Sequence, residues 1–148
     1  MENITKSYQK AVANTGSLLR KDVSNMELQK EQAVNFLQLI VAGEIDEAYE
    51  KYVSPDLRHH NPYFAGDAES LKQAMKGNDG TSPNKSLEVK QTIEEGDRVM
   101  VYSHIKQNPE DIGAAVVHIF RFQEGKIVEM WDIGQPVPED SPNENGMF

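Results

Sequence analysis

The chain is organised around the segment Ala114–Pro136, AAVVHIFRFQEGKIVEMWDIGQP. Two apolar runs flank Gln123-Glu124-Gly125, and a glycine accepts the left-handed backbone conformation that ends a three-residue hairpin loop. The pattern therefore predicts a long β-hairpin. In the register of a three-residue loop, His118 lies opposite Met130.

The predicted register divides the hairpin into two largely apolar faces, so we expect both faces to be covered. One face carries Val116, His118, Phe120, Val128, Met130 and Asp132, and the other carries Val117, Ile119, Arg121, Ile127, Glu129 and Trp131. His118 and Asp132 are the ionisable groups of the first face, diagonally placed on neighbouring strands. A two-residue loop would instead place His118 opposite Trp131 and move Asp132 to the other face.

Two further strands are predicted before this hairpin. Leu87, Val89 and Ile93 alternate with charged residues, which is typical of a half-buried strand. The segment Arg98–Gln107 forms its partner after the turn at Glu95-Gly96-Asp97. On this partner strand Val99, Val101 and Ile105 share one face, and Met100, Tyr102 and His104 share the other.

Helices are predicted in the first half of the chain. The expected elements are a helix after a capping box at Ser24–Glu27, a short helix from Ile45 to Val53, a short strand over Leu57–Asn61, a helix capped by Asp67, and a flexible loop over Gly77–Asn84. Helices followed by antiparallel strands predict an α+β fold in which a curved sheet carries helices on one face. We expect residues 1–23 to form an N-terminal arm and residues 24–148 to form a single domain.

Composition narrows the functional classes. The 148 residues carry a formal net charge of −9, which argues against nucleic acid or an anionic membrane as the main partner. The chain has no cysteine, so disulfides and thiol nucleophiles are excluded. Because its first residues, MENITKSYQK, lack the apolar core of a signal peptide, a cytoplasmic location is expected.

The segments HIFRFQEGKIVEMWDIGQPVPE, NGMF and LRHHNP resemble the SnoaL-like polyketide cyclase group of the nuclear transport factor 2-like superfamily. The resemblance extends over roughly Leu28–Phe148. It implies a cone-shaped fold, in which a curved antiparallel or mixed sheet wraps around N-terminal helices and encloses an apolar pocket. Fold transfers more readily than function within such a group.

The pair His59-His60 is the first candidate for a functional residue. Adjacent strand residues point to opposite faces, so only one of the two enters a pocket, and joint metal binding is not expected. By resemblance to the HNP motif of the family, His60 is the expected catalytic residue, with Asn61 as a ligand-binding neighbour. The alternative is that His60 and Asn61 bond to the backbone around Pro62.

His118 and Asp132 are the other catalytic candidates. Relatives commonly carry Asp in place of His118 and often His in place of Met130, so their acid–base pattern cannot be copied unchanged. The resemblance implies a carboxylate acid or base, for which Asp132 is the nearest candidate. His118 is either a satisfied core residue or a pocket residue, and Asp132 is either catalytic or a structural group bonded to the backbone or to His60.

The remaining pocket candidates are ligand-binding side chains: Asn61, Tyr102, His104, Phe120, Met130 and Trp131. Tyr102 and His104 have a second interpretation as half-exposed sheet residues. The sequence contains no Walker, dinucleotide or zinc motif, and neither a metal nor a cofactor is expected.

Three functions are compatible with these patterns. The first is an enzyme that performs acid–base chemistry on a small hydrophobic carbonyl compound, through aldol cyclisation, isomerisation or hydration. The second is a binding protein for a small hydrophobic molecule, and the third is a dimeric scaffold with a filled cavity. A homodimer through the outer sheet face is expected, because Val117, Ile119, Ile127 and Trp131 are apolar there. The closing segment Asn145–Phe148 is expected to dock, and a pocket mouth is the candidate place for it.

Overall fold

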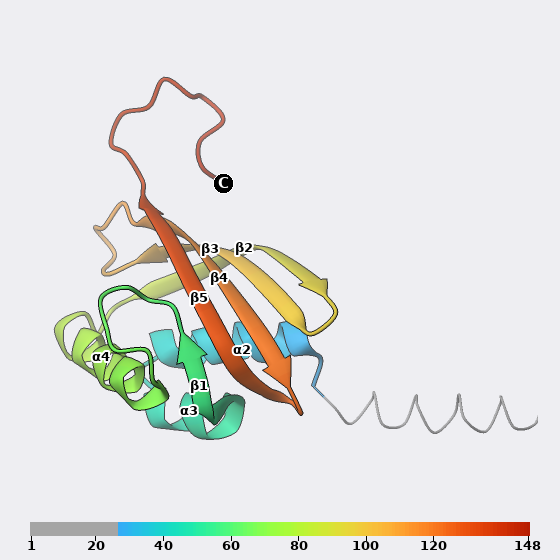
Figure 1. Ribbon diagram of the computed structural model, residues 1–148. Helices are drawn as coiled ribbons and strands as arrows, with labels where there is room; N and C mark the ends of the chain where they lie inside the picture. Colours follow the sequence, from blue (N-terminus) through green and yellow to red (C-terminus); the bar gives the residue numbers. More distant parts are fainter. Residues whose placement is uncertain (1–26) are drawn as a thin grey trace, which may run out of the picture.

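The computed structural model describes residues 27–148, which form three helices and a five-stranded sheet (Figure 1). The elements are α2 (Gln29–Val41), α3 (Ile45–Tyr52), β1 (Val53–His59), α4 (Ala68–Thr81), β2 (Ser86–Glu95), β3 (Arg98–Lys106), β4 (Ala114–Gln123) and β5 (Lys126–Pro136). The expected arm over residues 1–23 and the residue Ser24 of the capping box lie outside the described residues.

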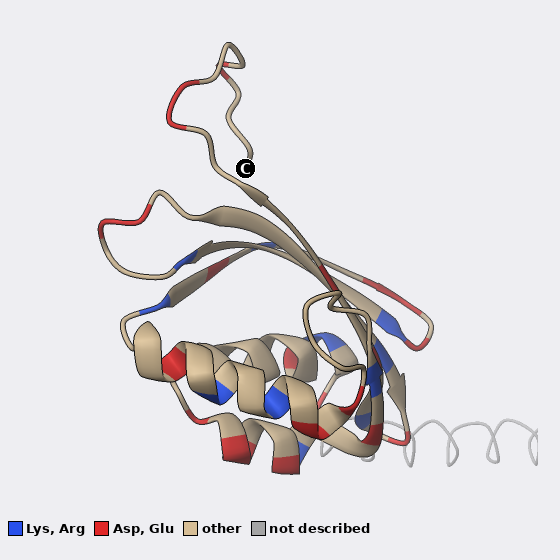
Figure 2. Cartoon of the chain, turned by 60° about the vertical axis from the view of Figure 1, so that its left-hand side comes forward, with Lys and Arg blue, Asp and Glu red and all other residues tan. Residues whose placement is uncertain are grey.

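The sheet is mixed and curved, as predicted. Its strand order is β1-β5-β4-β3-β2, in which β1 runs parallel to β5 and the other pairs are antiparallel. Figures 1 and 2 show the helices on the concave side of the sheet, and none of the described helices covers the convex side. We call these the inner and the outer face. The α+β prediction is confirmed, and the parallel β1 strand closes one side of the cone.

The hairpin turn differs from its prediction. Gln123 pairs with Lys126, so the loop has two residues, Glu124 and Gly125, whose φ angles are 52° and 75°. Two positive φ angles define the type I′ turn, whose twist matches that of the flanking strands. The prediction of a three-residue loop was therefore wrong.

A β-bulge just beyond the turn nevertheless places His118 and Asp132 on one face, as predicted. Phe122 pairs with Ile127, but Arg121 pairs with Glu129, so Val128 is the extra residue on β5. Because the bulge shifts the register by one residue, the residues of β5 from Glu129 onward lie on the faces that the three-residue loop predicted. Ile127, which had been assigned to the outer face, is fully buried in the core instead.

A second bulge changes the faces of the residues that follow it on β2. The register between β2 and β3 shifts between Val89 and Gln91. Beyond this shift Ile93 pairs with Met100 and is largely exposed, whereas Leu87 and Val89 pack against the core. The expectation that Ile93 shares a face with Leu87 was wrong, because simple alternation cannot anticipate an inserted residue.

Two helix boundaries also differ from prediction. The helix expected directly after Ser24 begins at Gln29, with Leu28 at the N-cap position. Asp67 caps α4 as expected, since its Oδ2 accepts a hydrogen bond from the Ser70 amide at 2.9 Å. The segment Gly77–Thr81, assigned to a flexible loop, is instead the last part of α4.

The core lies between the helices and the inner face of the sheet. Phe36 of α2 is fully buried, and its ring packs in edge-to-face geometry with Tyr49 and Phe120 at centroid distances of 5.9 and 5.8 Å. This packing joins α2, α3 and β4 around one aromatic cluster. Within residues 27–148, no helix has both the length and the apolar character that crossing a membrane requires.

The C-terminal residues dock on the protein, as predicted, but they lie on the outer face and not at the mouth of an inner pocket. The Phe148 ring stacks on His104 at 4.5 Å, and the Tyr102 hydroxyl donates a hydrogen bond to the Met147 carbonyl. The Lys90 ammonium lies 5.3 Å from the centre of the Phe148 ring. The tail therefore covers the outer side of β2 and β3 within its own chain.

The buried position of Ile127 predicts that two isoleucine-to-alanine substitutions differ greatly in their effect on the free energy of unfolding. Ile127→Ala should lower the free energy of unfolding by about 2–5 kcal/mol, because it opens a cavity in the core. Ile112→Ala, in a loop where the side chain is 46% exposed, should change it by less than about 0.5 kcal/mol. Urea denaturation of both variants checks this. Equal effects would contradict the observed register of the hairpin.

Candidate functional site

A cavity of about 160 Å³ lies between the helices and the inner face of the sheet. Its walls are contributed by α2, α4 and the sheet, and most of them are apolar. The lining residues are Phe36, Leu37, Ile40, Val41, Met75, Asn78, Lys85, Leu87, Ile105, Gln107, His118, Met130 and Asp132. An apolar cavity with a few converging polar groups is the usual form of a small-molecule site.

His118 and Asp132 lie directly opposite each other on β4 and β5, and both line this cavity. The His118 ring is parallel to the Phe120 ring, with centroids 5.9 Å apart. Its Nδ1 atom is buried and has no hydrogen-bond partner within the described part of the chain. The predicted shared face is therefore observed, with direct rather than diagonal pairing.

Burial controls the charge of His118. It lowers the pKa of the imidazole from its ordinary value of 6.5 to about 4, and the weaker opposing influence is the charge of Asp132. The imidazole is consequently neutral at pH 7. A neutral imidazole carries one N–H donor and one acceptor nitrogen, so His118 can exchange a hydrogen bond with a bound molecule.

Asn61 holds Asp132 in place. The Asn61 Nδ2 group donates a hydrogen bond to Asp132 Oδ2 at 3.0 Å, while Asn61 Oδ1 accepts one from the Tyr63 amide at 3.0 Å. The two bonds fix both ends of the amide group, and they identify Asn61, rather than His118 or His60, as the hydrogen-bond partner of Asp132. A carboxylate anchored through one oxygen keeps acceptor capacity for a ligand.

His59, rather than His60, belongs to the inner face. His59 pairs with Met130 and is buried, and its Nδ1 accepts a hydrogen bond from the Asn61 amide at 3.2 Å. Its Nε2 must then carry the proton that is shared with the Ala65 carbonyl oxygen, 2.5 Å away. His59 therefore fixes the loop that presents Asn61 to Asp132.

His60 lies on the outer face, so its assignment to the pocket was wrong. Its ring stacks on Trp131 at 4.8 Å, and its Nε2 lies 2.7 Å from Glu129 Oε2. The hydrogen bond from His60, with a further one from Arg121, holds the pKa of Glu129 below its usual range. Arg121 and Glu129 also form an ion pair, with Nη2 and Oε1 3.1 Å apart.

The other predicted ligand-binding residues divide between the two faces. Met130 lines the cavity, and Phe120 is buried beside His118 without lining it. Trp131 lies on the outer face with His60, and Tyr102 and His104 lie there beneath the docked tail. The outward placement follows from strand alternation, since each of these three residues neighbours an inward-facing residue.

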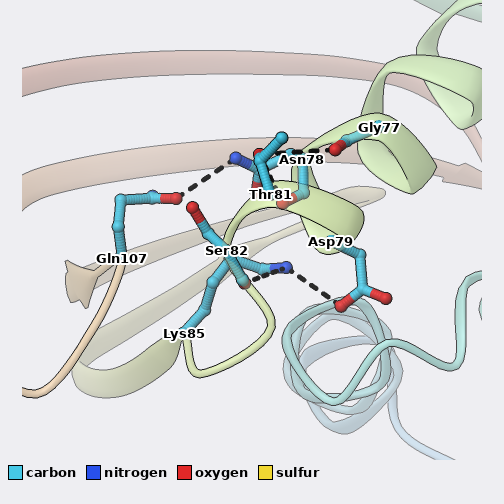
Figure 3. A network of polar contacts seen from close by, with 7 residues as sticks. All are labelled: Gly77, Asn78, Asp79, Thr81, Ser82, Lys85 and Gln107. Atoms are coloured by element: carbon cyan, nitrogen blue, oxygen red, sulfur yellow. Dashed lines mark hydrogen bonds and ion pairs between the residues drawn. The ribbon is translucent and has the colours of Figure 1, made fainter.

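Three polar residues of the cavity were missed by the sequence analysis: Asn78, Lys85 and Gln107. Figure 3 shows them where the end of α4 meets β3 and the start of β2. Lys85 precedes Leu87 by two residues, so continued alternation could have placed it on the inner face. Asn78 was hidden because its segment was assigned to a loop. Among residues 27–148 no group of His, Asp or Glu side chains is arranged to hold a metal ion.

Comparison with known proteins agrees with this architecture. Residues 33–130 match the family described as the SnoaL-like domain. Because the match covers more than half of the sequence, the chain belongs to the SnoaL-like domain family, as the resemblance implied. A search of curated protein sequences gave no match.

Several solved structures share the fold. One is an uncharacterised cystatin-fold protein from Novosphingobium aromaticivorans, with 19% identity and a TM-score of 0.62, over 73% of this chain and 99% of that one. Another is a candidate polyketide cyclase from Bacillus cereus, with 23% identity and a TM-score of 0.61, over 74% of this chain and 79% of that one. A candidate hydroxylase from Streptomyces galilaeus has 24% identity and a TM-score of 0.55, over 72% of this chain and 91% of that one. These similarities establish the fold and leave the chemistry to the site.

The lowered pKa of His118 predicts a specific pH dependence of stability. In the unfolded chain this group takes up a proton near pH 6.5, but in the folded chain only near pH 4. The stabilisation is therefore complete above pH 6.5 and is lost as the pH falls toward 4, by up to about 3 kcal/mol. Urea denaturation at pH 7.5 and 4.5 measures the free energy of unfolding at each pH. The decrease from pH 7.5 to 4.5 should be smaller for His118→Gln than for the wild type.

His104→Gln is the matched control, since His104 lies on the outer face against the Ile112 carbonyl and Phe148. It should retain the pH dependence of the wild type. An unchanged pH dependence in His118→Gln would show that His118 is accessible to water and takes up its proton at an ordinary pH.

Proposed function

We propose that this protein is an enzyme that performs cofactor-independent acid–base chemistry on a small hydrophobic carbonyl compound. The observation that carries the proposal is the placement of His118 and Asp132 on adjacent strands in one apolar cavity, with Asp132 oriented by Asn61. A base and a hydrogen-bond donor that converge on one space are the components that proton abstraction next to a carbonyl requires.

In the proposed reaction Asp132 acts as the base. Its carboxylate removes a proton from the carbon next to the carbonyl, and the electrons of that C–H bond move to the carbonyl oxygen. The neutral imidazole of His118 donates its N–H to the developing enolate oxygen. Asn61 is a positioning residue, because it acts through Asp132. His60 has no part in this mechanism, since it lies on the outer face.

The fate of the enolate defines the reaction type. Attack of its carbon on a second carbonyl of the same molecule gives an aldol cyclisation, and return of the proton at another carbon gives an isomerisation. The cavity of about 160 Å³ limits the substrate to a small molecule. The description of the similar Bacillus cereus structure as a candidate polyketide cyclase supports the first of these outcomes.

Deuterium exchange tests the proposal without knowledge of the natural substrate. Cyclohexanone and acetophenone in D₂O should exchange their protons next to the carbonyl faster with the protein than without it, as followed by proton NMR. Asp132→Asn should lower the catalysed rate by ~10²–10⁴-fold, because it keeps the shape and removes the base.

Asp140→Asn is the matched control, since Asp140 lies in the exposed C-terminal tail, and it should exchange at the wild-type rate. Binding of either ketone without accelerated exchange would instead support the alternative function, a non-catalytic binding protein. Equal exchange by Asp132→Asn and the wild type would remove Asp132 from the mechanism.

We also propose that the protein is a homodimer through the outer face of β4 and β5. With Ile127 in the core, the apolar residues on this face are Val117, Ile119, Trp131 and Ile133, and the Ile133 side chain is 63% exposed. Exposed apolar patches of this kind mark interfaces. A self-complementary patch that meets its own copy is the commonest arrangement in oligomers.

Sedimentation at micromolar concentration tests the dimer. The wild type should sediment as a dimer, and Ile133→Asp should shift it to a monomer, because a carboxylate would have to be buried in the interface. Ile112→Asp, outside this face, should leave the dimer intact. A monomeric wild type would contradict the proposal.

A further inference from the structure

We propose that Lys85 makes one end of the cavity a carboxylate-binding site, so that the substrate is a small carbonyl acid. This inference rests on the proposed function for the reaction that follows, but the binding of the carboxylate does not depend on turnover. It is carried by the burial of Lys85, by its weak contacts within the protein, and by the position of Asp132 in the same cavity.

Lys85 is an unusual lysine because its side chain is only 5% exposed. Lysine is almost never buried unless it is paired. Its Nζ lies 3.4 Å from Asp79 Oδ1 and 3.4 Å from the Ser82 carbonyl oxygen (Figure 3). Both distances exceed the usual range for hydrogen bonds from nitrogen to oxygen, so the ammonium group is only loosely held. An ammonium has three donors, and one or more remain for a ligand.

The surroundings of Lys85 are suited to an anion. Asn78 and Gln107 line the same end of the cavity, and Asn78 Nδ2 donates a hydrogen bond to Gln107 Oε1 at 3.2 Å. This bond orients the Gln107 amide, whose own N–H groups remain as donors. A buried ammonium beside amide donors gives charge-assisted hydrogen bonds to a carboxylate, which are stronger than bonds between neutral groups.

Asp79 is the counterion that a ligand carboxylate would replace. Its side chain is 33% exposed, so water can solvate it when Lys85 turns toward a ligand. Gly43 has a φ of +85° and would place a Cβ only 3.0 Å from both carboxylate oxygens of Asp79. The missing side chain at Gly43 therefore leaves space for the Asp79 carboxylate near Lys85.

The charges of the cavity determine how a carbonyl acid would lie in it. Asp132 repels a second carboxylate, while Lys85 attracts one, so the acid group is directed to the Lys85 end. The uncharged carbonyl part of the molecule then extends along the apolar walls toward His118 and Asp132. Binding energy from the remote acid group would thus position the reacting carbon beside the base.

The test compares para-acetylbenzoate with para-acetylbenzamide, which have nearly the same shape and differ in charge. Affinities are measured by protein-detected NMR titration at one ionic strength. The wild type should bind the acid about 10–100-fold more tightly than the amide, as expected for a desolvated charge-assisted contact. Lys85→Met should abolish this preference, and Lys85→Arg should keep most of it.

Two further variants separate ligand binding from a purely structural role. Lys90→Met, a matched substitution on the outer face, should behave as the wild type. Asp79→Asn should tighten binding of the acid and leave that of the amide unchanged, because the competing carboxylate is gone. A lysine that served only to pair with Asp79 would give no such gain. Circular dichroism and thermal unfolding establish that each variant is folded.

The results that overturn the proposal are equal affinity of the wild type for acid and amide, an undiminished preference in Lys85→Met, or no binding of the acid. The proposed function is tested separately in the same samples. Asp132→Asn should bind the acid at least as tightly as the wild type but should not exchange the methyl protons of the acetyl group. If the wild type binds the acid through Lys85 without exchange, the catalytic proposal fails and the carboxylate site stands.

Discussion

The bulge at Val128 is the constraint on which the inner face of this protein depends. The tight turn at Glu124-Gly125 fixes the start of pairing between β4 and β5. If pairing continued from the turn without the bulge, Val128 would lie opposite Arg121, His118 would lie opposite Trp131, and Asp132 would point to the convex side. With it, the core residues Phe120 and Met130 face each other, and His118 faces Asp132. The exclusion of Val128 from the pairing thus determines both the packing of the core and the composition of the cavity.

The prediction from sequence was right wherever a long pattern carried it. The alternation of apolar residues in β4 and β5 identified the hairpin, and the order of helices and strands identified the α+β class. Features that involve a single residue were not predicted. The bulges near Val89 and at Val128 leave no periodic signal, and their effect is to exchange the faces of all the residues that follow. His118 and Asp132 were predicted on one face by a register that was itself wrong.

The pair His59-His60 is a second case in which the sequence could not determine which residue faces inward. Strand geometry established that His59 and His60 point in opposite directions, but only the pairing of β1 with β5 reveals which one faces inward. That pairing is parallel and joins segments about 70 residues apart, so no local pattern reports it. Lys85 is a different case, because its face follows from Leu87 and Val89. It was overlooked because a lysine beside a predicted loop is ordinarily exposed.

The outer face has one further property that follows from the position of Trp131. This is the only tryptophan in the sequence, and its ring lies 4.8 Å from the His60 ring and 5.4 Å from the Arg98 guanidinium. Its neighbour in the chain, Asp132, points into the cavity on the opposite side of the same strand. The tryptophan fluorescence of the protein therefore arises from a single indole stacked on an imidazole. A shift of β5 on ligand binding would alter that stacking, and the emission would report it without an added label.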